Sequence, residues 1–162
     1  MLRWMVLKQS LILKTKPLKT LILSLATFFM LSFTTPNANT IDLTVEVHHL
    51  RNIKGVVQFA LYNKDGTIPD EDFEKYYKIG KATIKGKTAQ FVFKNLPKGT
   101  YAVNILHDED EDGEIDKGWV LPTEGIGFSN INKIGIGNKP NFKKAKFELS
   151  TTKQINVTVI YL

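Results

Sequence analysis

The chain of 162 residues contains no cysteine. Disulfides are therefore excluded, and so is the acylated bacterial lipoprotein route, which depends on a cysteine. Serine is also scarce, since residues 40–162 contain only Ser129 and Ser150. Ser129 lies in the segment GFSN, which is not the G-x-S-x-G elbow of serine hydrolases. A triad of Ser129, His107 and an aspartate is the remaining nucleophilic arrangement, and the sequence gives it little support.

Acidic residues are absent from the first 39 positions, which contain five bases. An apolar run at residues 20–33 follows these bases, and small and polar residues follow the run. This order is typical of a secretory signal peptide. We therefore expect residues 1–39 to be a signal peptide and the protein to be periplasmic or extracellular. The run is shorter than the roughly 20 residues of a membrane span, so we expect no span after cleavage. An uncleaved N-terminal anchor is the alternative.

Excess positive charge is also missing once this segment is set aside. The whole chain has 22 bases and 16 acids, but residues 40–162 have 17 bases and 16 acids. A basic surface is the usual mark of nucleic-acid binding, so we expect no nucleic-acid partner. Residues 40–162 have the length of one domain.

Apolar residues alternate with polar ones through most of residues 40–162, which is the pattern of half-buried β-strands. The sequence predicts strands at residues 41–48, 55–62, 81–85, 88–94, 100–107, 145–149 and 155–161, with a hairpin turn at residues 85–87. Only residues 69–77 look helical, because a proline and acids stand in the first turn. About seven short strands predict an all-β fold, a single antiparallel β-sandwich of the immunoglobulin or prealbumin type with at most one short helix. Residues 108–141 lack clean periodicity, and we expect one long ordered loop there.

Seven of the nine residues from 108 to 116 are acidic. Their spacing, D-x-D-x-D-G-x-x-D, is that of a calcium-binding loop, in which positions 1, 3 and 5 give side-chain oxygens, position 7 a backbone carbonyl and position 9 a water-mediated contact. Glycine at the sixth position permits the sharp turn. The candidate Ca²⁺ ligands at these positions are Asp108, Asp110, Asp112, Glu114 and Asp116.

Two features depart from an EF-hand loop. The twelfth position is Trp119 in place of the usual glutamate, and a predicted strand precedes the loop. We expect Glu124 to supply the missing ligand after the loop folds back. The alternative is a solvated acidic turn with no ion. A zinc site at His107 has too few ligands nearby, and we expect His107 to hold the loop through a hydrogen bond.

Several segments are similar to one bacterial family of secreted proteins. They are residues 93–101 (FKNLPKGTY), 99–108 (GTYAVNILHD), 112–116 (DGEID), 122–130 (PTEGIGFSN), 140–142 (PNF) and 145–147 (AKF). They resemble the family called domain of unknown function 2141, with a prealbumin-like or carboxypeptidase-regulatory-like sandwich. The chain departs from the family pattern at Gly118-Trp119-Val120, and it has acids where members often have asparagine. The resemblance implies the fold and export, and it implies no activity.

Three functions remain open on the sequence. The favoured one is a non-catalytic binding module whose loop presents a surface to a glycan or a protein, and the candidate surface residues are His107, Trp119, Phe128, Ser129 and Asn130. The second is a structural protein of the cell envelope, which would bury Trp119 and Phe128. The third is a glycan hydrolase that uses Glu124 and a loop carboxylate.

Overall fold

The computed structural model describes residues 40–119 and 121–162. The expected signal peptide at residues 1–39 lies outside the described residues. Within them the chain forms eight strands and one short helix. The elements are β1 (Thr40–His48), β2 (Val56–Tyr62), β3 (Lys78–Thr83), β4 (Ala89–Pro97), β5 (Gly99–Asp108), β6 (Gly125–Phe128), α2 (Phe142–Ala145), β7 (Phe147–Leu149) and β8 (Lys153–Thr158). In this part of the chain, no helix has the length and apolar character needed to span a membrane.

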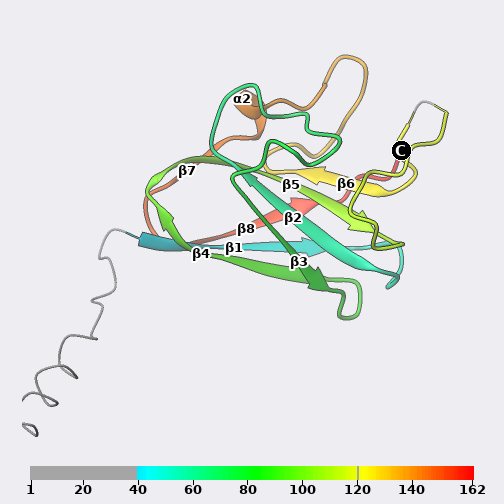
Figure 1. The fold of residues 1–162 in the computed structure, drawn as a ribbon, viewed down its shortest axis with the longest axis horizontal. Helices are drawn as coiled ribbons and strands as arrows, with labels where there is room; N and C mark the ends of the chain where they lie inside the picture. The colour runs from blue at the N-terminus through cyan, green and yellow to red at the C-terminus, as the bar shows by residue number, and fades with distance from the viewer. Residues whose placement is uncertain (1–39, 120) are drawn as a thin grey trace, which may run out of the picture. The chain divides into compact units, whose positions relative to one another are not determined.

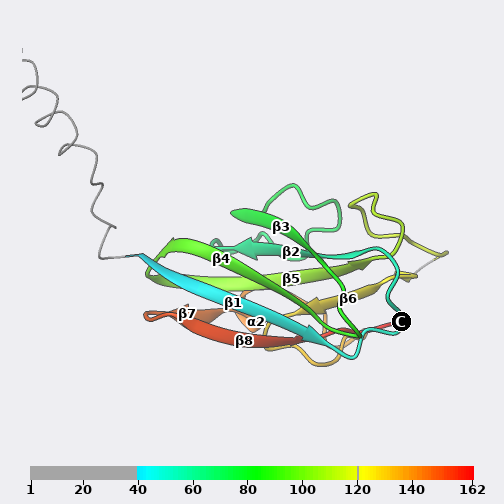
Figure 2. The same cartoon turned by 90° about the horizontal axis from the view of Figure 1, so that it is seen from below.

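The strands form two sheets, and the predicted all-β sandwich is confirmed. One sheet has the order β4-β1-β8, and the other has the order β3-β2-β5-β6, with β7 paired to one end of β5. Figures 1 and 2 show β1, β4 and β8 side by side. The pairing is antiparallel except between β1 and β8, which are parallel. The parallel pair arises because the chain leaves β7 in one sheet, turns at residues 150–152 and enters the other sheet beside β1.

The main core lies between the sheets and is built from alternate residues of each strand. Leu43, Val45 and Val47 of β1 are fully buried and pack against Val103 and Ile105 of β5. The alternation of apolar and polar residues predicted these positions. Burial of each such side chain contributes about 1.5–3 kcal/mol to the free energy of unfolding.

A second apolar cluster covers the outer face of the five-stranded sheet. Ala60 and Tyr62 of β2 and Ala102 and Leu106 of β5 belong to it. Figure 1 shows the loop after β2, the loop after β6 and α2 on the side of this sheet away from β1 and β4. Consequently β5 is buried on both faces from Tyr101 to Asp108. This double burial fixes the strand end at which the acidic segment begins.

The helix predicted at residues 69–77 is wrong, because these residues form turns and bends. The Asp70 carboxylate accepts hydrogen bonds from the backbone N–H groups of Glu74 and Lys75. Phe73 has a φ of 49°, outside the helical region, and its side chain is buried in the second cluster. A buried aspartate therefore organises this segment in place of backbone helix bonds.

The long loop expected at residues 108–141 contains a strand that the sequence analysis missed. This strand, β6, pairs with β5, and its Ile126 also exchanges two backbone hydrogen bonds with Ile160. Its glycines allow close packing, since a Cβ at Gly127 would lie 2.4 Å from the carbonyl oxygen of Thr158. The alternation Gly-Ile-Gly-Phe was the available signal.

The strands expected at residues 81–85 and 88–94 are β3 (Lys78–Thr83) and β4 (Ala89–Pro97), and three further elements also differ from their expected limits. The strand expected at residues 145–149 is reduced to β7, because Ala145 is the last residue of α2. Asn141 caps this helix, since its side chain accepts a hydrogen bond from the N–H of Lys144. The strand expected at residues 155–161 runs instead from Lys153 to Thr158. The hairpin expected at residues 85–87 is limited to a pair of hydrogen bonds between Lys85 and Thr88. Its flanking strands, β3 and β4, enter different sheets.

Candidate functional site

The acidic segment begins at the last residue of β5 and turns back at Gly113. Asp108 ends the strand, and Gly113 has a φ of 88°, a conformation that glycine adopts readily. The predicted role of this glycine is confirmed. The side-chain amide of Gln58 on β2 donates a hydrogen bond to the Gly113 carbonyl over 3.1 Å. The turn is therefore attached to the sheet next to β5.

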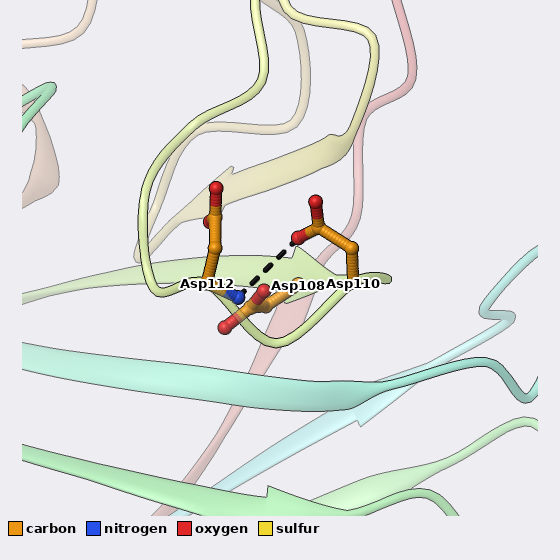
Figure 3. Close-up of side chains that lie close together, drawn as sticks. All are labelled: Asp108, Asp110 and Asp112. Atoms are coloured by element: carbon orange, nitrogen blue, oxygen red, sulfur yellow. Dashed lines mark hydrogen bonds between the residues drawn. The ribbon is translucent and has the colours of Figure 1, made fainter.

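Three carboxylates of this segment come together. Asp108, Asp110 and Asp112 each offer one oxygen, and the three oxygens lie within 4.8 Å of one another. Figure 3 shows the side chains of Asp110 and Asp112 pointing to the same side of the loop, with the Asp108 carboxylate below them. Two oxygens that share a calcium ion at about 2.4 Å each can be at most about 4.8 Å apart. The spacing of these oxygens therefore suits one Ca²⁺ ion.

Asp108 is the buried member of the group. Its Oδ2 accepts a hydrogen bond from the Lys81 ammonium on β3 over 2.7 Å, and its side chain is fully buried. Its Oδ1 is also buried and has no hydrogen-bond partner among the described residues. A buried acceptor without a partner costs about 1–3 kcal/mol, and more when it is charged. The unpaired Oδ1 of Asp108 therefore favours the binding of a cation by the three carboxylates.

Asp110 and Asp112 are exposed and shape the turn. The backbone N–H of Asp112 donates to Asp110 Oδ1 over 3.3 Å, as the dashed line in Figure 3 marks, and the N–H of Glu114 donates to Asp112 Oδ1 over 2.8 Å. Such bonds from a carboxylate to the backbone two residues on are typical of tight polar turns. They hold both side chains over Asp108.

Glu124 stabilises the loop through hydrogen bonds to its backbone. It lies just before β6 and is buried. Its two carboxylate oxygens accept the backbone N–H groups of Glu109 (2.6 Å) and Asp116 (3.3 Å). Burial raises the pKa of Glu124 above its ordinary value, and the two backbone bonds offset this only in part. Glu124 therefore connects the beginning of the loop to its end, and it does not belong to the group of three carboxylates.

The remaining candidate ligands are exposed. Glu114 and Asp116 lie on the outside of the turn, and neither side chain belongs to the group of three. The position-7 ligand of a calcium loop is a backbone carbonyl, so the orientation of the Glu114 side chain does not decide its role.

Glu109 does not belong to the group and is held by two side chains. Arg51 and Asn52 both donate hydrogen bonds to its carboxylate. Burial alone would raise the pKa of Glu109, but these hydrogen bonds outweigh it and hold the pKa below the ordinary value. Sequence reasoning missed Arg51, Asn52 and Lys81, because no local pattern indicates contacts across the sheet.

His107 joins two segments from the sandwich interior. Its Nδ1 is 2.8 Å from the Tyr161 hydroxyl, and its Nε2 is 3.1 Å from the Lys54 carbonyl. Gly55 lies directly against the acidic segment, since a Cβ there would be 1.9 Å from the Asp108 carbonyl oxygen. His107 is fully buried and holds the segment next to the loop, whereas we expected it to hold the loop itself through a hydrogen bond.

The candidate surface is only partly assembled. Trp119 is fully exposed, whereas His107, Phe128 and Ser129 are buried. The Ser129 hydroxyl donates to the carbonyl of Ala145 and accepts the N–H of Val103, so it links α2 to β5. The Asn130 amide donates to the Lys146 carbonyl. Three of the five candidate surface residues are therefore buried, and Trp119 is the exposed aromatic residue among the five.

Comparison with known proteins gives one match. A family described as "Uncharacterized protein conserved in bacteria (DUF2141)" matches residues 45–157. No curated protein and no solved structure shows a significant match to the chain.

Proposed function

Because the chain belongs to the bacterial family of uncharacterized proteins DUF2141, whose description assigns no activity, we propose from its own residues that it is an exported β-sandwich that binds calcium and acts as a non-catalytic binding module. The proposal concerns the group formed by Asp108, Asp110 and Asp112. The partner of the module is a molecule outside the cytoplasm.

The buried Oδ1 of Asp108 is the observation that carries the calcium proposal. Lys81 neutralises one oxygen of this carboxylate, and the other oxygen has no donor among the described residues. A solvated acidic turn would leave its oxygens to water, but this oxygen is buried. A Ca²⁺ ion shared with Asp110 and Asp112 would complete its coordination.

The other ligands would be backbone carbonyls and water, because Trp119 occupies the twelfth position and Glu124 is engaged by backbone N–H groups. Calcium accepts such mixed oxygen sets. With few protein carboxylates and Lys81 nearby, we expect a dissociation constant of about 10⁻⁴–10⁻³ M, the range of extracellular modules.

Trp119 supports the binding role over a purely structural one. The side chain is fully exposed immediately after the acidic segment. Exposed aromatic side chains are enriched in binding surfaces. A protein with only a structural role would bury both Trp119 and Phe128, and of the two only Phe128 is buried.

Thermal unfolding in EDTA and across a calcium titration tests the proposal. An ion that binds only the folded state adds about 2.7 kcal/mol at a hundredfold excess over its dissociation constant. We expect the midpoint of the wild-type chain to rise with calcium and the Asp110→Asn/Asp112→Asn variant to lose the response.

The matched control is Glu111→Gln/Glu114→Gln, which removes the same charge from the same loop but spares the group of three. It should keep most of the response. Equal loss in both double variants would mean diffuse charge screening and would contradict a calcium site. No calcium-dependent shift in the wild-type chain would contradict it as well.

A further inference from the structure

The outer face of the five-stranded sheet carries a pocket of about 570 Å³. Asn104 of β5 and Ile126 and Phe128 of β6 form its floor, and Asn104 and Phe128 are direct neighbours across the sheet. Its walls come from residues 69–71, from the segments that follow the acidic loop, and from residues 134–140. Pockets that hold small ligands usually measure about 300–1,000 Å³.

The walls expose apolar side chains to water. Ile136 is 99% exposed and Leu121 is 52% exposed, and both line this pocket together with Ile134 and Pro140. Isolated exposed apolar residues are common, but their convergence around one concave site is typical of a binding site. An apolar ligand would remove these side chains from water.

The floor contains one polar group that lacks a hydrogen-bond partner. Asn104 is buried, and its Oδ1 has no hydrogen-bond partner among the described residues. The amide oxygen of Asn104 can therefore accept a donor, and a ligand in the pocket that Asn104 lines could supply one.

The charged residues of the pocket balance one another. Asp70 and Glu71 carry negative charge, and Lys117 and Lys139 carry positive charge. Lys117 is also paired with Glu71 over 2.7 Å. The lining therefore favours neither an anionic nor a cationic ligand.

We propose that this pocket binds a small neutral aliphatic molecule that carries one hydroxyl group, with the hydroxyl donating to Asn104 Oδ1 and the hydrocarbon part against Ile126, Ile134 and Ile136. A sugar fits poorly, because most of its hydroxyls would face apolar walls without partners. The inference specifies the ligand of the proposed binding module. It does not depend on calcium, since none of the three clustered aspartates lines the pocket.

Amide NMR spectra of the wild-type chain, recorded in EDTA during titration with octan-1-ol, test the pocket directly. We expect saturable shifts at residues 126–128 and 134–136. The matched probe 1-methoxyheptane has the same number of heavy atoms but no donor, and it should bind at least about tenfold more weakly, which corresponds to about 1.4 kcal/mol. Octanoate should bind no more tightly than the alcohol.

Two variants separate the parts of the proposal. Asn104→Leu should remove the preference for the alcohol over the ether, because it removes the acceptor. Ile136→Ser should weaken both probes, and its matched control is Ile53→Ser, which changes an exposed isoleucine outside the pocket lining. Because Ile136 is exposed, this variant should fold even if Asn104→Leu does not.

Absence of saturable shifts would contradict ligand binding in the pocket. Equal binding of the alcohol and the ether would contradict the proposed hydrogen bond to Asn104. Tighter binding of octanoate would overturn the choice of a neutral ligand. Octanol binding in EDTA would support the pocket even if calcium fails to bind, so the two proposals can be judged separately.

Discussion

At the scale of single residues, Lys81 decides how strongly the acidic group attracts a cation. Its ammonium is 2.7 Å from Asp108 Oδ2 and would lie about 5 Å from an ion bound by the group. At that distance it repels a divalent ion by about 1 kcal/mol in a water-like dielectric with salt. We predict that Lys81→Met binds calcium about fivefold more tightly in calorimetric titration.

The same variant should be less stable without calcium by about 2 kcal/mol, because Asp108 loses the partner of its buried charge. Lys78→Met is the matched control on the same strand, since Lys78 contacts the Lys94 carbonyl and not the acidic group. Unchanged calcium affinity in Lys81→Met would show that the ion binds elsewhere.

Glu124 and Glu109 should give the protein opposite dependences on pH. The folded-state pKa of Glu124 is raised, so its contribution to stability is complete below the unfolded pKa of about 4.5 and is lost as pH rises through the folded pKa. The folded-state pKa of Glu109 is lowered, so its contribution is present above about 4.5 and is lost as pH falls through the folded pKa.

Denaturant unfolding from pH 3 to pH 7 measures both effects. The stability difference between wild type and Glu124→Gln should shrink as pH rises above about 4.5. The difference between wild type and Glu109→Gln should shrink as pH falls below that value. Parallel pH profiles for the two variants would contradict these assignments.

The sequence predicted the residues of the acidic turn but not their surroundings. The spacing of Asp108, Asp110 and Asp112 is a local property, so it was visible in the chain. The contacts of Lys81 with Asp108 and of Arg51 with Glu109 join residues 27 and 58 positions apart. No local pattern specifies such pairs, because they depend on which strands become neighbours.

At the scale of elements, β6 depends on glycine for its close contact with the last strand. A Cβ at Gly127 would be 2.4 Å from the backbone oxygen of Thr158, which cannot move without shifting β8. We predict that Gly127→Ala lowers the free energy of unfolding by about 2 kcal/mol, within the range for overpacked cores.

Gly135→Ala is the matched control, because its added Cβ would meet nothing within 4 Å. It should change stability by less than about 0.5 kcal/mol. Chemical denaturation of both variants measures the difference. Similar stabilities for the two would show that β6 does not pack tightly on the strand that ends at Thr158.

Strands with full alternation were predictable, and segments organised by single contacts were not. Residues 41–48 alternate over their whole length, and β1 has nearly the same limits. Residues 69–77 carry helical signals, but the Asp70 carboxylate captures two of their N–H groups. β6 is only four residues long, and half of it is glycine, which lowers strand propensity.

At the scale of the whole molecule, we predict that residues 1–39, which hold five bases and no acid, direct export of the protein. Export should remove the first 38 or 39 residues, because the small and polar residues that follow the apolar run end at Ala38 and Asn39, and we expect cleavage after one of these two. We predict that the intact mass of the protein recovered outside the cytoplasm corresponds to a chain that begins at residue 39 or 40. Recovery of the full-length chain in the membrane fraction would instead indicate an uncleaved anchor.

The parallel pairing of β1 with β8 also sets the order in which the molecule can be completed. Leu43 of β1 pairs with Lys153 of β8, which lies 110 residues later in the sequence. β1 therefore cannot complete its pairing until β8 is present. Contacts that span such a length form slowly, because a large loop must close first. On the export route that we propose, the sheet that contains β1 would therefore stay incomplete until nearly the whole chain has crossed the membrane. The complete sandwich would then form only on the far side of the membrane.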